Sequence, residues 1–358
     1  MNRFSIETPH HKYDAIVGRG ALQLLSEHIP ASAGLCFIVT TEDVWRLHGD
    51  SFLRALGDRP HHVLFFPGGE ARKRISEVEA LAEQVVALGG DRSSIVIAFG
   101  GGIVNDLGGF LAAIFMRGVP VIQVPTTLLA QVDASVGGKT GVNLVAGKNL
   151  VGSFHQPLVV LIDPSFLETL PEREYRAGLF EIVKCGIIAD EELFWLLRHE
   201  SGEVLSQAPG VVDRIISASV RIKAEVVSAD EKEGGLRRIL NFGHTFGHAL
   251  EAETHYSRFL HGEAVAFGMK AAVILAREEA MVNESDAAEM DACIAAYGPI
   301  PSCAGIPAAN LAGRLRSDKK TIQNKIHFVL PDRIGHVRVV SGLEETRVLA
   351  AIATALGN

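Results

Sequence analysis

Histidine and glutamate residues at metal-ligand spacing are the first sign of chemistry in this chain. His244 and His248 are four positions apart, so on one helix both imidazoles can face a single metal ion. Zinc proteases with the H-E-x-x-H pattern have a glutamate after the first histidine, whereas Thr245 stands there in this chain, and this disfavours that class. For the pair alone, a structural role stays open.

Two further residues extend this group. His261 opens the segment His261-Gly262-Glu263, at the predicted start of the next helix. Glu181 lies with Lys184 in an otherwise apolar segment, residues 179–188, where an ionised carboxylate needs a metal, a salt bridge or several hydrogen bonds. The alternative is an ordinary Glu/Lys pair on a helix surface. One carboxylate and two imidazoles could hold a metal ion and leave coordination positions open for a substrate.

Polar residues also precede and follow the histidine pair. Arg237, Asn241, His244, His248 and Glu251 are separated by four, three, four and three positions. This spacing predicts a cation-rich stripe on one face of a single helix.

A glycine-rich segment, Gly100–Gly109, follows a predicted strand. Glycines let backbone N–H groups approach a phosphate, and the N-terminus of a following helix attracts its charge. Asn105 stands where the G-x-G-x-x-G pattern needs its third glycine, so an ordinary dinucleotide fingerprint is only weakly supported. Glycine runs also mark tight packing between a strand and a helix. A pyrophosphate site and a packing role are both compatible with this segment.

Two lysines lie in the next glycine-rich stretch. Lys139 and Lys148 are expected in loops just past strand ends, where an ammonium group can reach a phosphate as a point charge. A single lysine is more often a solvated surface residue. Two of them so close to the glycine segment favour a ligand.

The elements that must position these residues differ between the two halves of the chain. Strands are predicted at 35–40, 62–66, 95–99 and 120–124, with helices at 44–56 and 76–88. This alternation predicts an α/β domain with a parallel sheet over residues 1–162. Residues 163–358 are predicted to form a mostly helical domain with one late hairpin. Its predicted helices span residues 172–188, 210–227, 242–253, 263–279 and 285–297, and the hairpin strands span 326–330 and 336–340.

Composition limits the class of protein. At 358 residues the chain is expected to form two domains. Its net charge of −8 argues against nucleic-acid and membrane binding. The four cysteines form no C-x-x-C pair, and no N-terminal leader or membrane anchor is apparent, so a reducing, cytoplasmic location is expected.

Long motifs in the chain resemble 3-dehydroquinate synthase, a family of the sugar phosphate cyclases. The resemblance covers most of the chain in order and is more specific than any single motif above. It is carried by the segments 116–118, 125–133, 137–141, 169–173, 240–249, 261–266 and 318–320, together with the stretch from Gly100 to Lys184.

The resemblance implies an enzyme of the shikimate pathway. Such an enzyme converts 3-deoxy-D-arabino-heptulosonate 7-phosphate to 3-dehydroquinate and phosphate, using NAD+ that is regenerated in each turnover and a divalent metal, Zn2+ or Co2+. A homodimer is also implied. The steps are transient oxidation, phosphate elimination, reduction and an intramolecular aldol closure.

The resemblance also implies roles for particular residues. The implied metal ligands are Glu181, His244 and His261, while His248 would face the substrate. The residues implied for substrate binding and catalysis are Arg117, Asp133, Lys139, Lys184, Lys223, Arg237, Asn241, His248 and Lys319. Those implied for NAD+ are Asp43, Gly68, Gly69, Glu70, Lys73, Gly101, Gly102, Ile103, Val104, Asn105, Asp106, Thr126, Thr127, Lys139, Lys148, Asn149, Phe166 and Thr169.

The chain departs from the family pattern at three places. Thr41-Glu42-Asp43 replaces a common Asp-x-Asn, which moves the expected ribose contact to Asp43. Asn105 replaces a glycine, and Cys185 stands where tyrosine is common. None of these is an implied metal ligand.

Other classes remain as alternatives. Cyclases such as 2-deoxy-scyllo-inosose synthase and 2-epi-5-epi-valiolone synthase act on substrates without the carboxylate. Arg237 and the motif Gly137–Val142 favour 3-dehydroquinate synthase over them. Metal-dependent alcohol or glycerol dehydrogenases would release NADH as a product. A non-catalytic nucleotide-binding regulator would not need the metal ligands together with the cations.

Overall fold

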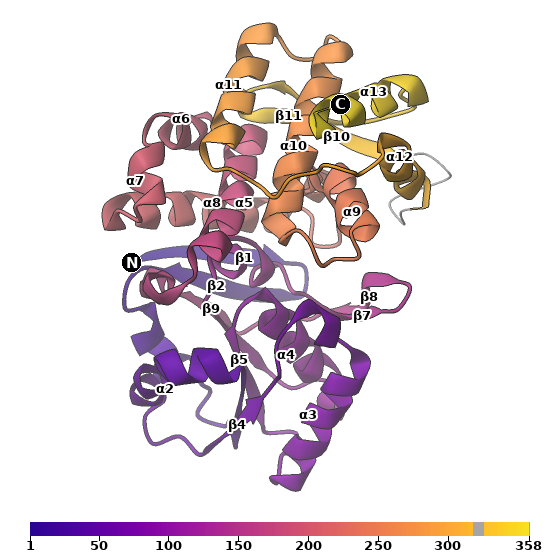
Figure 1. The fold of residues 1–358 in the computed structure, drawn as a ribbon. Helices are drawn as coiled ribbons and strands as arrows, with labels where there is room; N and C mark the ends of the chain where they lie inside the picture. Colours follow the sequence, from indigo (N-terminus) through magenta and orange to yellow (C-terminus); the bar gives the residue numbers. More distant parts are fainter. Residues whose placement is uncertain (318–325, 358) are drawn as a thin grey trace. The chain divides into compact units, whose positions relative to one another are not determined.

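The computed structural model describes residues 1–317 and 326–357. They form two compact units (Figure 1): unit 1 is Met1–Tyr175 with Lys223–Ser228, and unit 2 is Arg176–Ile222 with the described residues of Ala229–Asn358. The boundary predicted between residues 162 and 163 lies within unit 1, next to the 3-10 helix η5 (Pro164–Thr169). Lys319, implied by the resemblance as a substrate contact, lies outside the described residues.

A seven-stranded sheet forms the centre of unit 1, in the order β1-β2-β9-β6-β5-β3-β4. Neighbouring strands are parallel except for β1 and β2. The four predicted strands are confirmed as β3 to β6, with ends shifted by at most one residue, whereas β1, β2 and β9 are not predicted. The strands are β1 (Asn2–Thr8), β2 (His11–Val17), β3 (Cys36–Thr40), β4 (His61–Phe65), β5 (Ile95–Gly100), β6 (Val121–Pro125) and β9 (Val159–Ile162).

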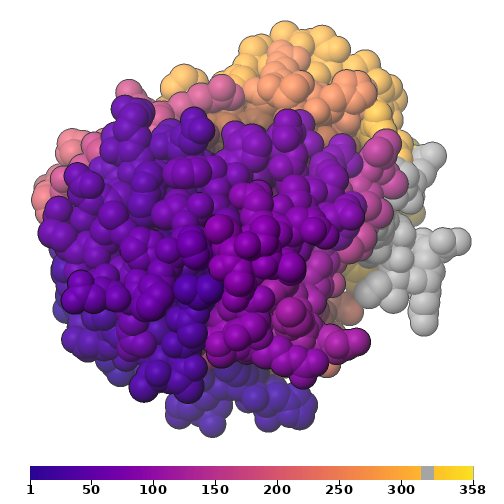
Figure 2. Space-filling view, turned by 90° about the horizontal axis from the view of Figure 1, so that it is seen from below, coloured from indigo at the N-terminus to yellow at the C-terminus, as the bar shows by residue number. Residues whose placement is uncertain are grey.

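Helices cover both faces of this sheet (Figure 1). Alternate strand residues point to opposite faces, so Ile38 and Ile97 pack under α2, while Val39 and Ala98 pack under α3 and α4. Both layers are buried apolar cores, as the continuous apolar strands require. Figure 2 shows one face of this unit, coloured indigo to purple. Its helical segments are η1 (Ala21–Leu24), α1 (Leu25–His28), α2 (Glu42–Leu56), η2 (Glu70–Arg72), α3 (Ile75–Ala87), α4 (Gly102–Ile114), η3 (Phe115–Arg117), η4 (Ala130–Ala134) and η5.

The second glycine-rich stretch forms a hairpin rather than loops. Lys139 begins β7 (Lys139–Leu144), and Lys148 lies in β8 (Gly147–Phe154), so the predicted loop positions are wrong. The glycines here serve strand pairing, since a Cβ atom on Gly152 would lie 2.1 Å from the carbonyl oxygen of Thr140. An antiparallel pair pressed this closely tolerates no side chain at that position.

Unit 2 is mostly helical, as predicted. The five predicted helices and the late hairpin are confirmed, and α6, α7, α12 and α13 are additional. The elements are α5 (Glu172–Ala189), α6 (Glu191–His199), α7 (Ser201–Leu205), α8 (Pro209–Ala229), η6 (Leu236–Asn241), α9 (His244–Glu253), α10 (His261–Glu278), α11 (Glu284–Ala296), α12 (Ala308–Ser317), β10 (His327–Arg333), β11 (His336–Ser341) and α13 (Glu345–Leu356). Residues 172–175 of α5 and 223–228 of α8 belong to unit 1.

The polar stripe does not lie on one helix. Arg237 and Asn241 belong to the 3-10 helix η6, and α9 begins only at His244. Gly243 separates the two with a φ of +78°, a left-handed conformation in which a Cβ atom would lie 2.8 Å from the carbonyl oxygen of Val265. The predicted continuous helix is therefore wrong, because the 3.6-residue spacing cannot reveal a glycine break.

The sequence predicts neither a disulfide framework nor a membrane anchor. The structure contains no disulfide among the four cysteines, which are all free thiols: Cys36, Cys185, Cys293 and Cys303. In the described part of the chain, no helix combines the length and apolar character that a membrane span requires.

Candidate functional site

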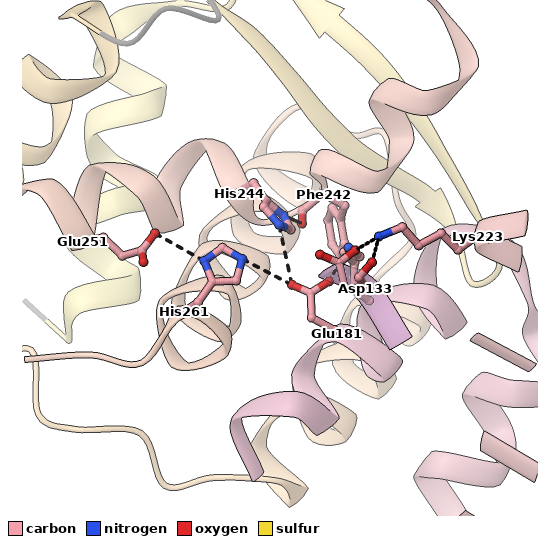
Figure 3. Close-up of polar contacts among 8 residues, drawn as sticks. Asp133, Glu181, Lys223, Phe242, His244, Glu251 and His261 are labelled. Carbon is pink, nitrogen blue, oxygen red and sulfur yellow. Dashed lines mark hydrogen bonds and ion pairs between the residues drawn. The ribbon is translucent and has the colours of Figure 1, made fainter. Parts of the chain in front are cut away.

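Three helices of unit 2 bring Glu181, His244 and His261 together (Figure 3). Their ligand atoms lie within 4.8 Å of one another. Oε1 of Glu181 is 3.5 Å from Nε2 of His244 and 3.7 Å from Nε2 of His261. Both imidazoles thus point one nitrogen at the same carboxylate oxygen.

Close helix contacts create this convergence. His261 is the first residue of α10, and a Cβ atom on the next residue, Gly262, would lie 1.8 Å from the carbonyl oxygen of Ala177 in α5. Ala177 is one helical turn before Glu181, so the bare glycine lets the start of α10 approach the turn that carries the carboxylate. On α9, Gly247 makes a similar approach to Ala264 of α10.

The two oxygens of the Glu181 carboxylate differ in their hydrogen bonding. Nζ of Lys184 donates to Oε2, and both side chains are almost fully buried. This excludes the surface-pair alternative. Oε1 is buried and accepts no hydrogen bond from the described residues. A buried carboxylate oxygen without a hydrogen bond is costly, and a metal ion between it and the two imidazoles would relieve that cost. The donor set therefore fits a divalent metal such as zinc.

The other nitrogen of each imidazole also has an acceptor. Nδ1 of His244 lies 3.1 Å from the carbonyl oxygen of Phe242, and Nδ1 of His261 lies 3.4 Å from Oε2 of Glu251 (Figure 3). Metal-bound histidines are commonly oriented in this way. The ring of His248 lies 5.5 Å from that of His244, centroid to centroid. His248 also belongs to a second group, with Glu251 and His261, whose ligand atoms lie within 4.8 Å of one another.

In unit 2, the carboxylate of Asp230 holds the loop that precedes η6 through backbone hydrogen bonds. Burial opposes ionisation of Asp230, but N–H groups of Gly235, Arg237 and Gly234 donate to its carboxylate and lower its pKa overall. The same loop accepts a hydrogen bond from the buried guanidinium of Arg237 at the carbonyl oxygen of Glu231.

In unit 1, one of the implied substrate cations is paired with an implied substrate carboxylate. Nζ of Lys223 lies 2.5 Å from Oδ1 of Asp133, which sits in the π-helical turn η4. Arg117 ends η3 with a left-handed φ of +70°. Lys139, at the start of β7, is exposed. The structure brings Lys223 and Asp133 together.

Several of the residues implied for NAD+ follow strands of the sheet, as Gly101 follows β5 and Thr126 follows β6. A pocket of about 600 Å³ lies beyond β3 and β4, lined by Thr41, Glu42, Asp43, Arg46, Phe65, Phe66 and Pro67. Gly68 and Gly69, both with positive φ, come directly after Pro67 in the chain. Gly102 begins α4 after β5, so this helix presents its N-terminus at the same sheet edge.

A buried lysine links three of the implied segments. Nζ of Lys73 donates to Asp106 on α4 and, at 2.6 Å, to Oδ1 of Asn149 on β8. Burial raises the pKa of Asp106, and the charge of Lys73 opposes this rise. The geometry therefore joins the loop after β4, the glycine-rich helix and the hairpin.

Other implied NAD+ residues have structural contacts. The amide nitrogen of Asn105 donates to the carbonyl oxygen of Ala98 in β5, at 3.2 Å, so its side chain faces the sheet. Phe166 packs against Phe99 with ring centroids 5.6 Å apart. Thr169 contacts His48 through its hydroxyl group, at 2.9 Å. Thr127 accepts a hydrogen bond from the N–H of Ala130 at the turn after β6.

Asn143, which is not among the residues predicted from the sequence, completes this network. Its Nδ2 donates to Oε1 of Glu70 at 2.7 Å, and its Oδ1 accepts the N–H of Asn149 at 2.9 Å. Its own N–H donates to the carbonyl oxygen of Lys73 at 2.8 Å. The segment is predicted as a loop, where an asparagine is ordinary, so the sequence offers no signal for this role.

Comparisons with known proteins identify the family to which the chain belongs. Residues 63–177 match the family model described as 3-dehydroquinate synthase N-terminal, and residues 178–321 match 3-dehydroquinate synthase C-terminal. A 3-dehydroquinate synthase of Solibacter usitatus is 60% identical over 99% of this chain and 100% of its own length.

Solved structures of related cyclases superpose over nearly the whole chain. A 2-epi-5-epi-valiolone synthase of Streptomyces hygroscopicus, with NAD+ and Zn2+ bound, has a TM-score of 0.90 and 29% identity, covering 98% of each chain. A 2-deoxy-scyllo-inosose synthase in complex with carbaglucose-6-phosphate, NAD+ and Co2+ has a TM-score of 0.89 and 26% identity, covering 99% of each chain.

Proposed function

Because the chain belongs to the 3-dehydroquinate synthase family, we propose that Glu181, His244 and His261 hold the divalent metal of its reaction. The enzyme converts 3-deoxy-D-arabino-heptulosonate 7-phosphate to 3-dehydroquinate and phosphate. One observation carries the metal assignment: the buried Oε1 of Glu181 accepts no hydrogen bond from the described residues, although two imidazole nitrogens face it.

Zinc is the metal we propose, with cobalt as a substitute. One carboxylate and two imidazoles are typical zinc donors, and three protein ligands leave a position for substrate oxygens. When bound, such a metal acts as a Lewis acid on hydroxyl and carbonyl oxygens of the substrate. Lys184 holds the other oxygen of Glu181 and so keeps Oε1 directed at the ligand position.

We propose that NAD+ binds along the sheet edge of unit 1. Asp43 and the pocket around it would receive the adenosine end, and the N–H groups at the start of α4 the pyrophosphate. When bound, NAD+ accepts a hydride from the substrate and returns it later in the same turnover. Lys73, Asp106 and Asn149 fix the surrounding segments. The other implied NAD+ residues keep the roles proposed from the resemblance.

The substrate carries a phosphate and a carboxylate, so its recognition requires cations. In unit 1 we propose Arg117, Lys139 and Lys223 for this task, with Asp133 orienting Lys223. In unit 2 we propose Lys184 and Arg237, with Asn241 and His248 as polar contacts. Fixed positive groups bind anionic oxygens without having to reorganise during the reaction. Lys319 and a homodimeric assembly stay predictions.

The test is a phosphate-release assay. With catalytic NAD+ and Zn2+, the purified protein is expected to release phosphate from 3-deoxy-D-arabino-heptulosonate 7-phosphate without net NADH absorbance. Phosphate release from sedoheptulose 7-phosphate, which lacks the carboxylate, should be negligible. Stoichiometric NADH would contradict a cyclase and indicate a dehydrogenase.

A variant tests the metal assignment. Glu181→Gln is expected to abolish turnover, because the neutral amide is a poor metal ligand in a buried site. Binding of NAD+, measured by calorimetry, should stay close to wild type, since the proposed NAD+ residues lie in unit 1. Retained turnover would refute Glu181 as a ligand.

A further inference from the structure

Glu251 faces the nitrogen of His261 that points away from Glu181 (Figure 3). Its Oε2 lies 3.4 Å from Nδ1 of His261, while Nε2 of the same ring lies 3.7 Å from Oε1 of Glu181. One imidazole therefore stands between two carboxylates, and each ring nitrogen faces one of them. A neutral imidazole carries a proton on only one nitrogen, so the two carboxylates compete to decide which one.

We propose that Glu251 is a positioning residue that sets the tautomer and direction of His261. Its carboxylate accepts the Nδ1–H, which leaves the lone pair of Nε2 aimed at the metal position beside Glu181. The inference rests on the proposed metal site and assigns a role to a residue outside the ligand set.

Burial makes this contact consequential. The Glu251 side chain is 2% exposed, and an ionised carboxylate at such a position needs donors to balance its lost hydration. With the proton on Nε2 instead, the Nδ1 lone pair would face the carboxylate oxygen, and Nε2 could not bind a metal. The repulsion between this lone pair and the carboxylate, and the loss of metal binding, both favour the tautomer with the proton on Nδ1.

The two histidine ligands are oriented by different groups. Nδ1 of His244 faces the backbone carbonyl of Phe242, which no side-chain substitution removes. Nδ1 of His261 faces a side chain on the neighbouring helix α9. A point substitution at Glu251 can therefore change the orientation of His261.

A second metal ion is the competing explanation of the same cluster. His248, Glu251 and His261 have ligand atoms within 4.8 Å of one another. If a second ion shared His261 with the first, the ring would have to bind through both nitrogens and lose its one N–H proton. A single Nδ1–H hydrogen bond needs no such deprotonation.

The experiment measures zinc affinity of the full chain by competition with a chromophoric chelator. Glu251→Gln is expected to weaken Zn2+ binding by about 10–100-fold, the usual effect of removing a partner of a metal-bound histidine. It should also shift the visible absorption of the Co2+-loaded protein. Glu251→Asp, which keeps the carboxylate, should recover part of the affinity. The matched control is Glu253→Gln on the same helix, whose carboxylate contacts Arg314 and Asn310. It is expected to bind zinc as the wild type does.

A double-variant comparison separates orientation from general damage. In a His261→Ala background, Glu251→Gln should cause no further loss of zinc affinity, because the residue through which it acts is gone. An equal loss in that background would overturn the proposal. Wild-type affinity in Glu251→Gln would also overturn it.

Stoichiometry distinguishes the remaining outcomes. Two zinc ions per wild-type chain, falling to one in Glu251→Gln, would make Glu251 a ligand of a second ion and overturn its role as an orienting group. One ion per chain in both proteins, held more weakly by the variant, supports the proposal. If the wild type binds no zinc at all, the proposed metal site itself is refuted, and this inference with it.

Discussion

Asn143 joins two segments of unit 1 that the sequence treats as separate. Its side-chain amide donates to Glu70, in the turn after β4, and accepts from the backbone of Asn149, in the hairpin. Both partners are proposed to contact NAD+. A residue that uses donor and acceptor together can hold the two segments in one arrangement before the cofactor binds, which reduces the ordering cost of binding.

Replacing this amide should therefore weaken the cofactor site selectively. Asn143→Ala is expected to raise the Kd of NAD+ by about 10-fold, the cost of losing a hydrogen bond to a charged partner. Isothermal titration calorimetry measures this, alongside zinc affinity, which should not change. Asn310→Ala is the matched control, since Asn310 bonds a surface carboxylate of unit 2. An unchanged NAD+ affinity in Asn143→Ala would contradict the role of this residue.

Among the elements, the contact between α5 and α10 is decisive for the metal site. Glu181 lies on the first helix and His261 begins the second. Gly262 allows their approach because it has no Cβ atom. A Cβ atom at this position would lie 1.8 Å from the carbonyl oxygen of Ala177. Backbone cannot move aside as a flexible side chain can, so any larger residue must separate the two helices.

Gly262→Ala is accordingly expected to lower the free energy of unfolding by about 1–3 kcal/mol, the usual cost of overpacking. It should also weaken zinc binding, because the separation moves His261 from Glu181. Urea unfolding and the chelator assay measure the two effects. Gly202→Ala in α7, where a Cβ would meet nothing within 4 Å, should instead leave zinc affinity intact and stabilise its helix slightly. Equal behaviour of the two variants would refute the packing argument.

For the whole molecule, the proposed ligands divide between the two compact units. The NAD+ residues lie in unit 1, and the metal ligands lie in unit 2. A ligand that binds only the folded state stabilises the part it binds, by about 2.7 kcal/mol at a hundredfold excess over its Kd.

Hydrogen exchange followed by mass spectrometry can test this division. Zn2+ is expected to slow exchange chiefly in α5, α9 and α10, and EDTA should reverse that protection. NAD+ is expected to slow exchange chiefly at residues 68–73, 101–106 and 143–149. Zinc protection confined to unit 1 would contradict the assignment.

Predictions from the sequence were most accurate where they depended on local pattern. Apolar runs marked β3 to β6, and helical periodicity marked α2, α3 and the main helices of unit 2. They failed where geometry depends on a partner strand or one glycine. Glycine-rich sequence usually indicates loops, so the β7–β8 hairpin is not predicted. Its glycines are instead required by close pairing of the two strands. The spacing from Arg237 to Glu251 predicts one helix, but the left-handed Gly243 divides it into η6 and α9.

The sequence by itself determined the family, the two kinds of domain and the candidates Glu181, His244, His248 and His261, because residue types, spacings and long motifs are properties of the chain alone. Spacing could not choose among these candidates without the resemblance. Only the tertiary structure decided which nitrogen of each imidazole faces Glu181, that one oxygen of this buried carboxylate lacks a hydrogen bond from the described residues, and that Glu251 stands behind His261. These depend on how closely three helices approach, and that distance is set by packing between residues far apart in the sequence.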